Sequence, residues 1–309
     1  MRIRGAGWGY GFAALAALIS GVSIYVNSFG VRLFHDATVY TTLKNSVGGA
    51  VLLTALIVSS RRRAEYRALD RRQALWLIAL AITGGSVPYV LFFEGLLQTN
   101  AVTASVLNHL QFAFVALIAF VFLRERVAPP MWAALAVLLV GVTLGTNLGR
   151  VHLDRGAWLI LASTLLFAID FVIAKHLLRN LSTLAVMTAK MSLGSLMLVA
   201  YTVATGKLGL VTHLTAAQWR ITVGVGLILL AFTVATFIAI RLVSVTAVIA
   251  IGQASPIVTA LIDLIQTHRL RLPVLNSLGL LITLLAVATI LLIGGRQERA
   301  GAGLSGLEA

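Results

Sequence analysis

Long apolar runs alternate with short polar segments along the whole chain. Each run holds about 20 apolar residues, which is the length that an α-helix needs to cross a bilayer core of about 30 Å. The runs are too uniformly apolar for barrel strands, whose side chains would alternate between polar and apolar. The pattern predicts ten membrane-spanning helices, at 9–30, 37–58, 74–97, 101–123, 130–148, 156–178, 182–204, 217–240, 244–265 and 273–294.

The composition agrees with a membrane protein. Hydrophobic residues make up 59% and charged residues 11% of the 309, whereas soluble domains carry about 25% charged residues. The net charge of +14 does not indicate a nucleic-acid partner, because the basic residues are spread between the apolar runs. The chain has no cysteine, which excludes disulfides and thiolate metal sites, and neither a metal nor a cofactor is expected.

The basic residues also predict the orientation. With the N-terminus placed in the cytoplasm, most of the 24 lysines and arginines fall on the cytoplasmic side, and the segment RRRAEYRALDRR (61–72) contributes the largest share. Short cytoplasmic loops carry an excess of these residues. We therefore expect both termini in the cytoplasm.

The two halves of the chain share polar residues at matching positions. Lys44 and Lys190 are 146 positions apart, and AVTASVL (101–107) resembles SVTAVIA (244–250) at an offset of 143. Five spans in each half is an odd number, so the second copy would be inverted in the membrane, a common arrangement in secondary transporters. The expected fold is an all-α membrane protein with inverted five-helix repeats at 1–150 and 151–296, followed by a disordered cytoplasmic tail at 297–309.

Ionisable and polar side chains inside the spans are the candidates for function. A charge at mid-helix costs about 2.5–3.5 kcal/mol on insertion scales, so such residues are often functional. By depth, Lys44 can pair with Glu94, and Lys190 with Asp170; the pairs either hold helices together or meet substrate, and the sequence leaves both open. His109 would also suit proton coupling. The candidate substrate-binding residues are Lys44, Lys190, Glu94, Asp170, His109, Asn108, Gln111, Gln253, Ser23, Asn27 and Tyr89.

Prolines, glycines and one further acid complete the pattern. Pro88 and Pro256 should interrupt the third and ninth helices, because proline removes a backbone hydrogen bond. Asp263 lies near the outer end of its helix, where a charge can reach water, and it is expected to have no role in binding. The spacing of Gly141, Gly145 and Gly149 predicts a close helix–helix contact.

Two segments carry a family resemblance. AVTASVLNHLQFAFVALIAFVFLRERVAPP (101–130) and the weaker SVTAVIAIGQASPIVTALID (244–263) resemble the drug/metabolite transporter superfamily, and within it the EamA-type exporters of ten helices. The likeness covers nearly the whole chain. The family commonly has an acidic residue after its ninth helix, as Glu125 stands after the fourth, but this chain has His268 there. It also tends to carry arginine where this chain has Lys44.

The resemblance and the repeats together imply a secondary active transporter. It would export a small polar metabolite, such as an amino acid, by alternating access across a bacterial or archaeal cytoplasmic membrane. Two lysines and a histidine leave open an exchanger of small organic anions such as phosphorylated metabolites. A membrane receptor or scaffold is the alternative of another class.

An enzyme is not expected, since the chain lacks HExxH and GxSxG motifs. The expected partners are the bilayer and a small-molecule substrate, with proton or counter-substrate coupling open.

Overall fold

A computed structural model describes residues 2–34, 36–125, 129–145, 152–267 and 274–305, and all regular structure within these ranges is helical. The first half contains α1 (Arg2–Leu33), α2 (Ala37–Val58), α3 (Ser60–Arg67), α4 (Arg71–Leu80), η1 (Ala81–Ser86), α5 (Val87–Gln98), α6 (Ala101–His109), α7 (Gln111–Ile118), η2 (Ala119–Leu123) and α8 (Pro129–Leu144). The second half contains α9 (Arg155–Leu177), α10 (Thr183–Thr188), η4 (Ala189–Leu193), α11 (Gly194–Ala204), η5 (Lys207–Leu210), α12 (Ala216–Leu242), α13 (Val245–Gly252), α14 (Ser255–Thr267) and α15 (Val274–Ser305).

The predicted membrane class is confirmed. Within the described ranges, nine helical segments are long and apolar enough to cross a membrane. The fifth predicted span, 130–148, is represented by a shorter apolar helix at Pro129–Leu144. Residues 146–151, which would complete that span, lie outside the described part of the chain.

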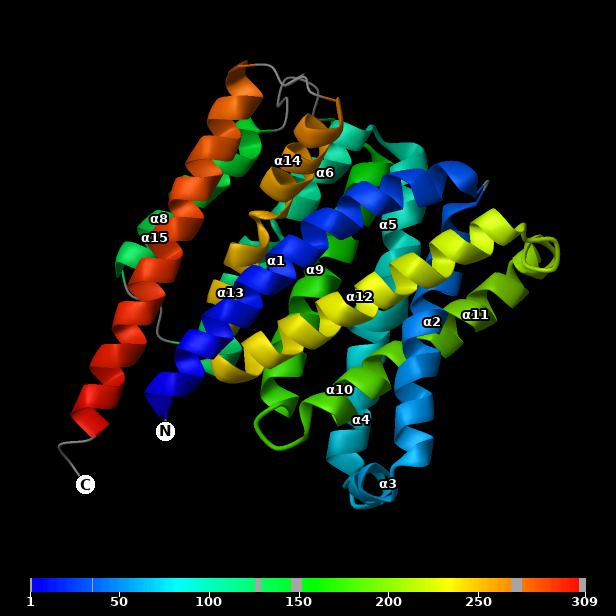
Figure 1. Ribbon diagram of the computed structural model, residues 1–309, viewed down its shortest axis with the longest axis horizontal. Coiled ribbons are helices and arrows are strands. Elements are labelled where there is room, and N and C mark those ends of the chain that lie inside the picture. The colour runs from blue at the N-terminus through cyan, green and yellow to red at the C-terminus, as the bar shows by residue number, and fades with distance from the viewer. Residues whose placement is uncertain (1, 35, 126–128, 146–151, 268–273, 306–309) are drawn as a thin grey trace.

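The helices form one bundle with two distinct ends (Figure 1). The start of α1, the end of α15 and the short helix α3 lie at one end, which we call the termini end. The end of α1, the start of α6 and the end of α14 lie at the other, which we call the opposite end. α1 lies beside α12, and α8 pairs with α15 at one side of the bundle.

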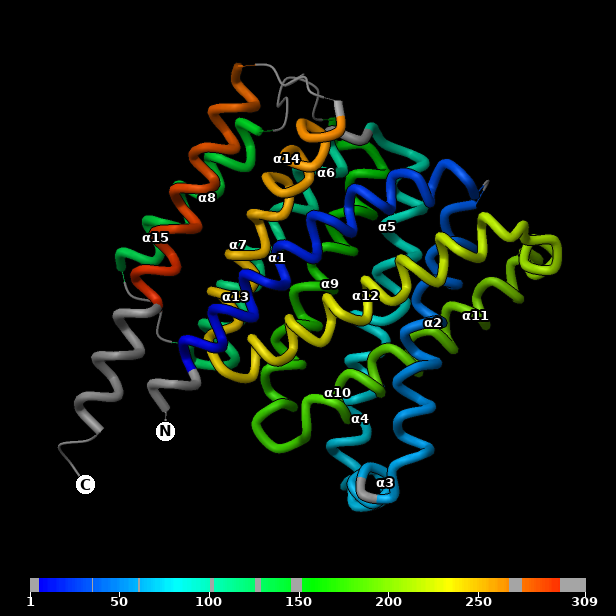
Figure 2. Tube along the Cα trace, viewed as in Figure 1, coloured from blue at the N-terminus to red at the C-terminus, as the bar shows by residue number. Residues whose placement is uncertain are grey.

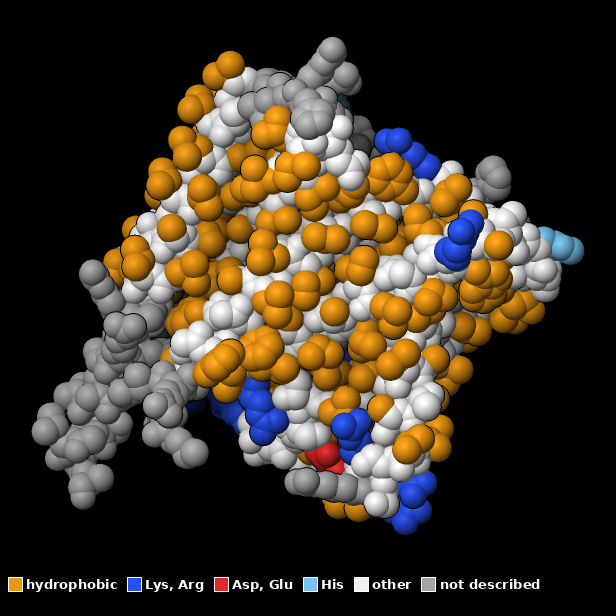
Figure 3. All heavy atoms as spheres, viewed as in Figure 1, with side chains coloured by type: hydrophobic (Ala, Val, Ile, Leu, Met, Phe, Trp, Pro, Cys, Tyr) orange, Lys and Arg blue, Asp and Glu red, His pale blue; other side chains and the backbone are white. Residues whose placement is uncertain are grey.

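The surface of the bundle suits a lipid environment. On the face shown in Figure 3, hydrophobic side chains cover the middle, while lysine and arginine side chains lie toward the ends and gather along the lower edge. Large apolar side chains such as Phe122, Trp158 and Ile265 are exposed. A soluble protein rarely exposes apolar area on this scale, so this belt is expected to face lipid.

Side chains at the helix starts explain where the helices begin. The first N–H groups of a helix have no carbonyl partner inside it, and short polar side chains accept hydrogen bonds from them. Such caps are made by Asp36, Asp70, Asn100, Asp154, Ser182, Thr215 and Ser244. The polar residues between the apolar runs are therefore the caps that fix the start of the next helix.

The predicted interruption near Pro88 is present as a widened turn. η1 is a π-helix that ends directly before α5, whose second residue is Pro88. Because proline has no N–H, the regular hydrogen-bond ladder cannot continue through this turn. Within η1, the Ser86 hydroxyl donates to the Ala81 carbonyl at 3.1 Å. η4 is another π-helix, in the segment of the second half that corresponds to α2 when Lys44 is matched with Lys190. A Cβ at Gly85 would come within 2.6 Å of the Lys190 carbonyl oxygen, so glycine permits the two π-helices to meet.

The close contact predicted from the spaced glycines joins α8 to α15. A Cβ at Gly141 would lie 2.7 Å from the Thr283 nitrogen, and one at Gly279 would lie 2.6 Å from the Gly145 Cα. Gly149 lies outside the described residues. These glycines therefore allow α8 and α15, the last helices of the two halves, to pack closely.

The buried apolar core is uneven. Its largest cluster lies toward the termini end and includes Leu77, Leu123, Met131, Leu177 and Ile240. Two smaller clusters, around Leu107 and around Tyr40, lie toward the opposite end. The bundle is therefore more tightly closed at the termini end.

The last helix continues past its apolar span. α15 runs to Ser305, and residues 306–309 lie outside the described part of the chain. The disordered tail expected at 297–309 stays a prediction. The sequence RQERA at 296–300 consists of residues with high helix propensity. These residues extend the last apolar helix beyond its membrane span.

Candidate functional site

A cavity of about 900 Å³ lies between the two halves and reaches the opposite end of the bundle, where Ser28 and Asp263 are exposed. Its walls come from α1, α5, α6, α7, α9, α12, α13 and α14, with Gly145, Asn276 and Leu280 at one edge. Both halves of the chain therefore contribute to one space.

Two interrupted helices meet at the middle of this cavity. The fourth predicted span is divided into α6 and α7 around Leu110, and the ninth into α13 and α14 around Ala254. The Nδ1 atom of His109 and the Oε1 atom of Gln253 form a hydrogen bond of 2.7 Å across the two interruptions. α7 and α13 lie side by side (Figure 2). Helices interrupted at matching places are a recurrent feature of substrate sites in transporters.

Four of the eleven candidate residues line the cavity. They are Asn108, His109, Gln111 and Gln253. The other seven, Lys44, Lys190, Glu94, Asp170, Ser23, Asn27 and Tyr89, lie outside its described lining. The candidate side chains beside the helix interruptions therefore belong to the cavity, whereas Lys44, Lys190, Glu94 and Asp170 do not.

Sequence reasoning missed a polar stripe on α14. Ser255, Thr259 and Asp263 all line the cavity. Their spacing of four residues places them on one face of a helix, and that spacing is the signal that could have found them. Asp263 is exposed, as expected for a charge near the end of its helix, and it also belongs to the cavity lining; that it has no role in binding stays a prediction. Sequence reasoning also missed Tyr25, Ser28, Ser105 and Thr236.

The predicted pairing of Lys190 with Asp170 is confirmed. The Lys190 ammonium and the Asp170 carboxylate form an ion pair, and the Asp170 side chain is 0% exposed. The ammonium also lies 5.3 Å from the ring centroids of Phe171 and Phe237. Phe171 is also part of the cavity wall, so this residue contacts both the ion pair and the cavity.

Glycine makes room for this ion pair. A Cβ at Gly84 would collide with the Asp170 carboxyl group. One carboxylate oxygen, Oδ1, is buried and accepts no hydrogen bond among the described residues. The Tyr89 ring stacks edge-on against Phe167, three residues before Asp170, at 5.1 Å. The π-helix η1 therefore packs its glycine directly against a buried charge.

The predicted pairing of Lys44 with Glu94 is wrong. The Lys44 ammonium donates to the Asn27 side-chain oxygen at 3.0 Å, and the Tyr40 hydroxyl donates to the same oxygen at 2.9 Å. Asn27 in turn donates to the Ser23 hydroxyl at 3.0 Å. Depth in the membrane placed Glu94 and Lys44 at similar levels, but helix packing puts Asn27 of α1 against α2.

Two expectations about these residues remain untested. Glu94 is half-buried in α5, and its backbone carbonyl accepts from Gln98 at 3.1 Å. Lys44 is half-buried, while Thr41 and Gly48 on the same helix are buried. A methyl group at Gly48 would meet the end of the Met191 side chain, so this face of α2 packs against the second half. That Lys44 faces a transport pathway stays a prediction.

The cavity has a defined chemical character. Its described lining contains no lysine or arginine, and Asp263 is its one carboxylate. Hydroxyl, amide and imidazole groups alternate with the rings of Tyr25, Phe92, Phe171 and Phe232. A mostly apolar cavity with a few placed polar groups is the usual form of a small-molecule site. This arrangement can bind and orient a small solute, and the searched part of the chain holds no group of ligands suited to a metal ion.

The fold and this site define a class: a polytopic α-helical membrane protein whose two halves enclose a mostly apolar cavity with a few polar groups. Comparison with known families gives the particular one. The model of the EamA-like transporter family matches residues 7–146 and again residues 154–292, so the chain belongs to that family. The resemblance seen in the sequence is thereby confirmed, and the same family model describes both halves.

Individual relatives are distant. An uncharacterized transporter of Methanothermobacter thermautotrophicus is 23% identical over an alignment of 210 residues, and the match covers 62% of this chain and 60% of that protein. A solved crystal structure matches 96% of this chain and 100% of its own with a TM-score of 0.72 and 16% identity. The crystal structure supports the fold alone. The names of the family and of the relative point to a transporter rather than an enzyme.

Proposed function

We propose that the protein is a secondary active transporter that exports a small polar metabolite, an amino acid or a related compound, by alternating access. The observation that carries this proposal is the cavity of about 900 Å³, which both halves line and which reaches one end of the bundle. Asn108, His109, Gln111 and Gln253 contact the substrate in this conformation. The membrane is the cytoplasmic membrane of a bacterium or archaeon, with both termini inside.

The proposed alternating-access mechanism depends on the proposed architecture of ten spans in two inverted repeats. The double match to one family model supports the duplication. The interruptions at Leu110 and Ala254, 144 positions apart, support equivalent roles for the two helices. Five spans in each half would turn the second copy over in the membrane, and two such copies can rock about a site between them.

The lining favours a neutral or zwitterionic substrate. A phosphorylated or dicarboxylate anion needs cationic partners once it is desolvated, but Lys44 and Lys190 lie outside the described lining, and each already has a partner. A zwitterion can use hydroxyl and amide donors for its carboxylate and Asp263 or ring faces for its ammonium group. This chemistry supports an amino acid over the anion-exchange alternative.

Transport into liposomes tests the function. The purified protein is reconstituted, and the uptake of radiolabelled amino acids is compared with that of sugar phosphates. Asn108→Leu keeps a side chain branched at the same atom but removes the amide, and we expect at least about a tenfold loss of substrate affinity, as for an unmade hydrogen bond in a dry site.

Asn45→Leu is the matched control. Asn45 is also an asparagine inside a span, but its amide donates to the Thr41 carbonyl at 2.8 Å and it lies outside the described lining. Affinity should be unchanged in this variant. Uptake of neither solute class, in either direction and across an imposed proton gradient, would favour the receptor or scaffold alternative.

A further inference from the structure

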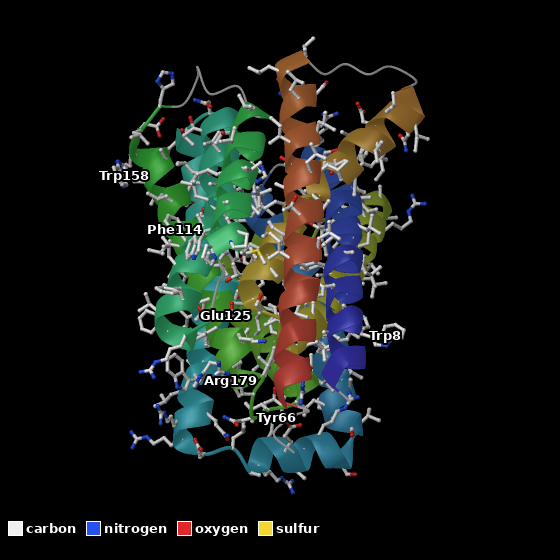
Figure 4. The ribbon with its side chains drawn as sticks, turned by 90° about the vertical axis from the view of Figure 1, so that its left-hand side faces the viewer. Trp8, Tyr66, Phe114, Glu125, Trp158 and Arg179 are labelled. Carbon is white, nitrogen blue, oxygen red and sulfur yellow. The ribbon has the colours of Figure 1, made fainter. Side chains whose placement is uncertain are left out.

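At the termini end, the carboxylate of Glu125 holds the start of a helix from the other half of the chain. Its Oε1 atom accepts from the Val245 N–H at 2.9 Å. Its Oε2 atom accepts from the Thr246 hydroxyl at 3.0 Å and from the Thr246 N–H at 3.5 Å. Figure 4 shows Glu125 in the part of the bundle nearer to α3.

These bonds complete the first turn of α13. The first amides of a helix have no acceptor within the helix. In α13, the Ser244 hydroxyl accepts from the Ala247 N–H at 3.3 Å, and Glu125 accepts from the two amides before it. Val245 and Thr246 are 0% and 2% exposed, so water cannot take the place of the carboxylate. A negative charge there also interacts favourably with the helix dipole.

An unusual backbone turn directs Glu125 toward α13. Arg124 has φ 53° and is the one residue other than glycine with a positive φ in the described part of the chain. After this turn, the Glu125 N–H donates back to the Ala119 carbonyl at 3.2 Å, which ends η2. Strained residues of this kind persist where the surrounding structure requires them, often at switching sites.

A second contact of the same type lies nearby. The Glu65 carboxylate of α3 accepts from the Ser182 N–H at 2.8 Å and from its hydroxyl at 2.7 Å, at the start of α10. The neighbouring Tyr66 hydroxyl donates to the Ala185 carbonyl at 2.6 Å. Glu65, Tyr66 and Glu125, which we call the termini clasp, therefore join the first half to the first turns of two second-half helices.

We propose that Glu125 is the latch of a gate at the termini end. The cavity reaches the opposite end, while the termini clasp and the largest apolar cluster close this one. Opening the closed end separates the start of α13 from the turn after η2, and the bonds of Glu125 join these two segments. This inference rests on the proposed transport function, because a gate has a role only where both ends open in turn.

The two ends differ in chemistry, so the latch belongs to one of them. The position equivalent to Glu125 in the second half is His268, which lies outside the described residues. The threonine equivalent to Thr246 is Thr103, whose hydroxyl accepts from the His152 N–H at 3.1 Å. That amide comes from the segment between the halves. The carboxylate contact at the termini end is therefore the feature to test.

Distances between spin labels report directly on this gate. The chain has no cysteine, so labels on Phe122→Cys and Leu242→Cys, both exposed, give one distance across the contact of Glu125. With Glu125 unchanged, the two labels should give a single narrow distribution of distances. In Glu125→Gln, we expect the population at longer distance to rise about fivefold or more, since a neutral amide is a weaker acceptor and its NH₂ group opposes the amides of α13.

Asp70→Asn is the matched control. Asp70 also caps a helix with its carboxylate at the termini end, but it accepts from the Gln73 N–H at 2.7 Å within its own half. This change should leave the distance distribution unaltered. An unaltered distribution in folded Glu125→Gln would overturn the proposal. If Glu125→Gln does not fold, Thr246→Val removes one of the bonds, and an absence of any shift there has the same meaning.

The experiment separates the latch from the transport function, because the distance measurement needs no substrate. Flux through the protein without a shift in Glu125→Gln would contradict the latch and leave the function standing. A shift without flux of any solute would contradict the function and leave the latch standing.

Discussion

Lys44 and Lys190 occupy matching places in the sequence, but the structure stabilises their charges differently. Lys190 has a carboxylate partner and two aromatic rings, whereas Lys44 has the amide oxygen of Asn27 and the ring of Tyr40 at 5.1 Å. A buried ion pair depends on both members, because removing one strands the other in a medium of low dielectric constant. Replacing Lys190 should therefore cost more stability than replacing Lys44.

A double-mutant cycle tests the Lys190–Asp170 pair. We expect Lys190→Met to lower the free energy of unfolding by about 3–5 kcal/mol, because it leaves the Asp170 carboxylate buried without a partner. Adding Asp170→Asn should recover a large part of this loss. Lys44→Met, which strands no carboxylate, is the control and should cost less. Unfolding in mixed detergent micelles is measured for the wild type, Lys190→Met, Asp170→Asn, the double variant and the control. Strictly additive losses in the two single variants would show that the pair does not interact.

At the scale of elements, polar caps determine where helices start, and prolines or a polar contact mark where helices are interrupted. Pro88 and Pro256 mark interruptions that the sequence predicted. The division between α6 and α7 at Leu110 has no proline or glycine, and there the His109–Gln253 hydrogen bond joins the two interrupted helices. Caps at the other helix starts link successive helices, as Asp36 does between α1 and α2.

The cap at Asp36 predicts a pH dependence of stability. Burial raises the pKa of Asp36, but the hydrogen bond from Lys207 and those from the α2 amides outweigh burial and hold the pKa below its ordinary value. Its Oδ2 atom lies 2.7 Å from the Lys207 ammonium. A lowered pKa in the folded state stabilises the protein above the unfolded pKa of about 3.9, and this stabilisation disappears as pH falls through the folded value.

Asp36→Asn isolates this effect, because asparagine is also a good cap. At pH 6 the variant should be less stable by about 0.2–1 kcal/mol, as for a partly exposed ion pair. As the pH falls below the unfolded pKa of about 3.9, the difference should decrease, and it should vanish below the lowered folded pKa, where the wild-type carboxyl is protonated in both states. Thermal unfolding over a series of acidic pH values measures this. A difference that stays constant across the series would mean that the charge on Asp36 is not its source.

At the scale of the whole molecule, the two ends of the bundle are unequal. The largest apolar cluster and the termini clasp close one end, and the cavity reaches the other. A bundle of two related halves could be closed at either end, so the sequence of each half alone does not determine which end of the bundle is open. Contacts between halves, such as those of Glu65 and Glu125, favour closure of the termini end.

The orientation of the molecule follows from its charges and can be tested by labelling. A cysteine at Ala64 or Ala68, both exposed beside α3, should not react with a membrane-impermeant thiol reagent added to intact cells, because the arginine-rich segment is expected in the cytoplasm. A cysteine at Thr212, exposed before α12, is the control and should react. Labelling at 64 or 68 but not at 212 would reverse the proposed topology.

The sequence by itself determined the class of the molecule and the positions of its spans. A backbone in lipid must satisfy its own hydrogen bonds, so long apolar runs can only become helices there. The cost of an intramembrane charge likewise made the pairing of Lys190 with Asp170 predictable, because an unpaired Asp170 at 0% exposure would be strongly unfavourable. Each of these conclusions depends only on the chemistry of a single segment or of a single pair of residues, which the sequence provides.

Only the tertiary structure decided which polar residues share the cavity. Membrane depth is a single coordinate, and it placed Lys44 near Glu94, whereas rotation about the helix axes turns Lys44 toward Asn27. The same rotation puts Asp263 in the cavity wall and leaves the lysines outside its described part. Side chains pack against lipid and against other helices with similar energies, so apolar patterning alone cannot fix those rotations; contacts between helices do.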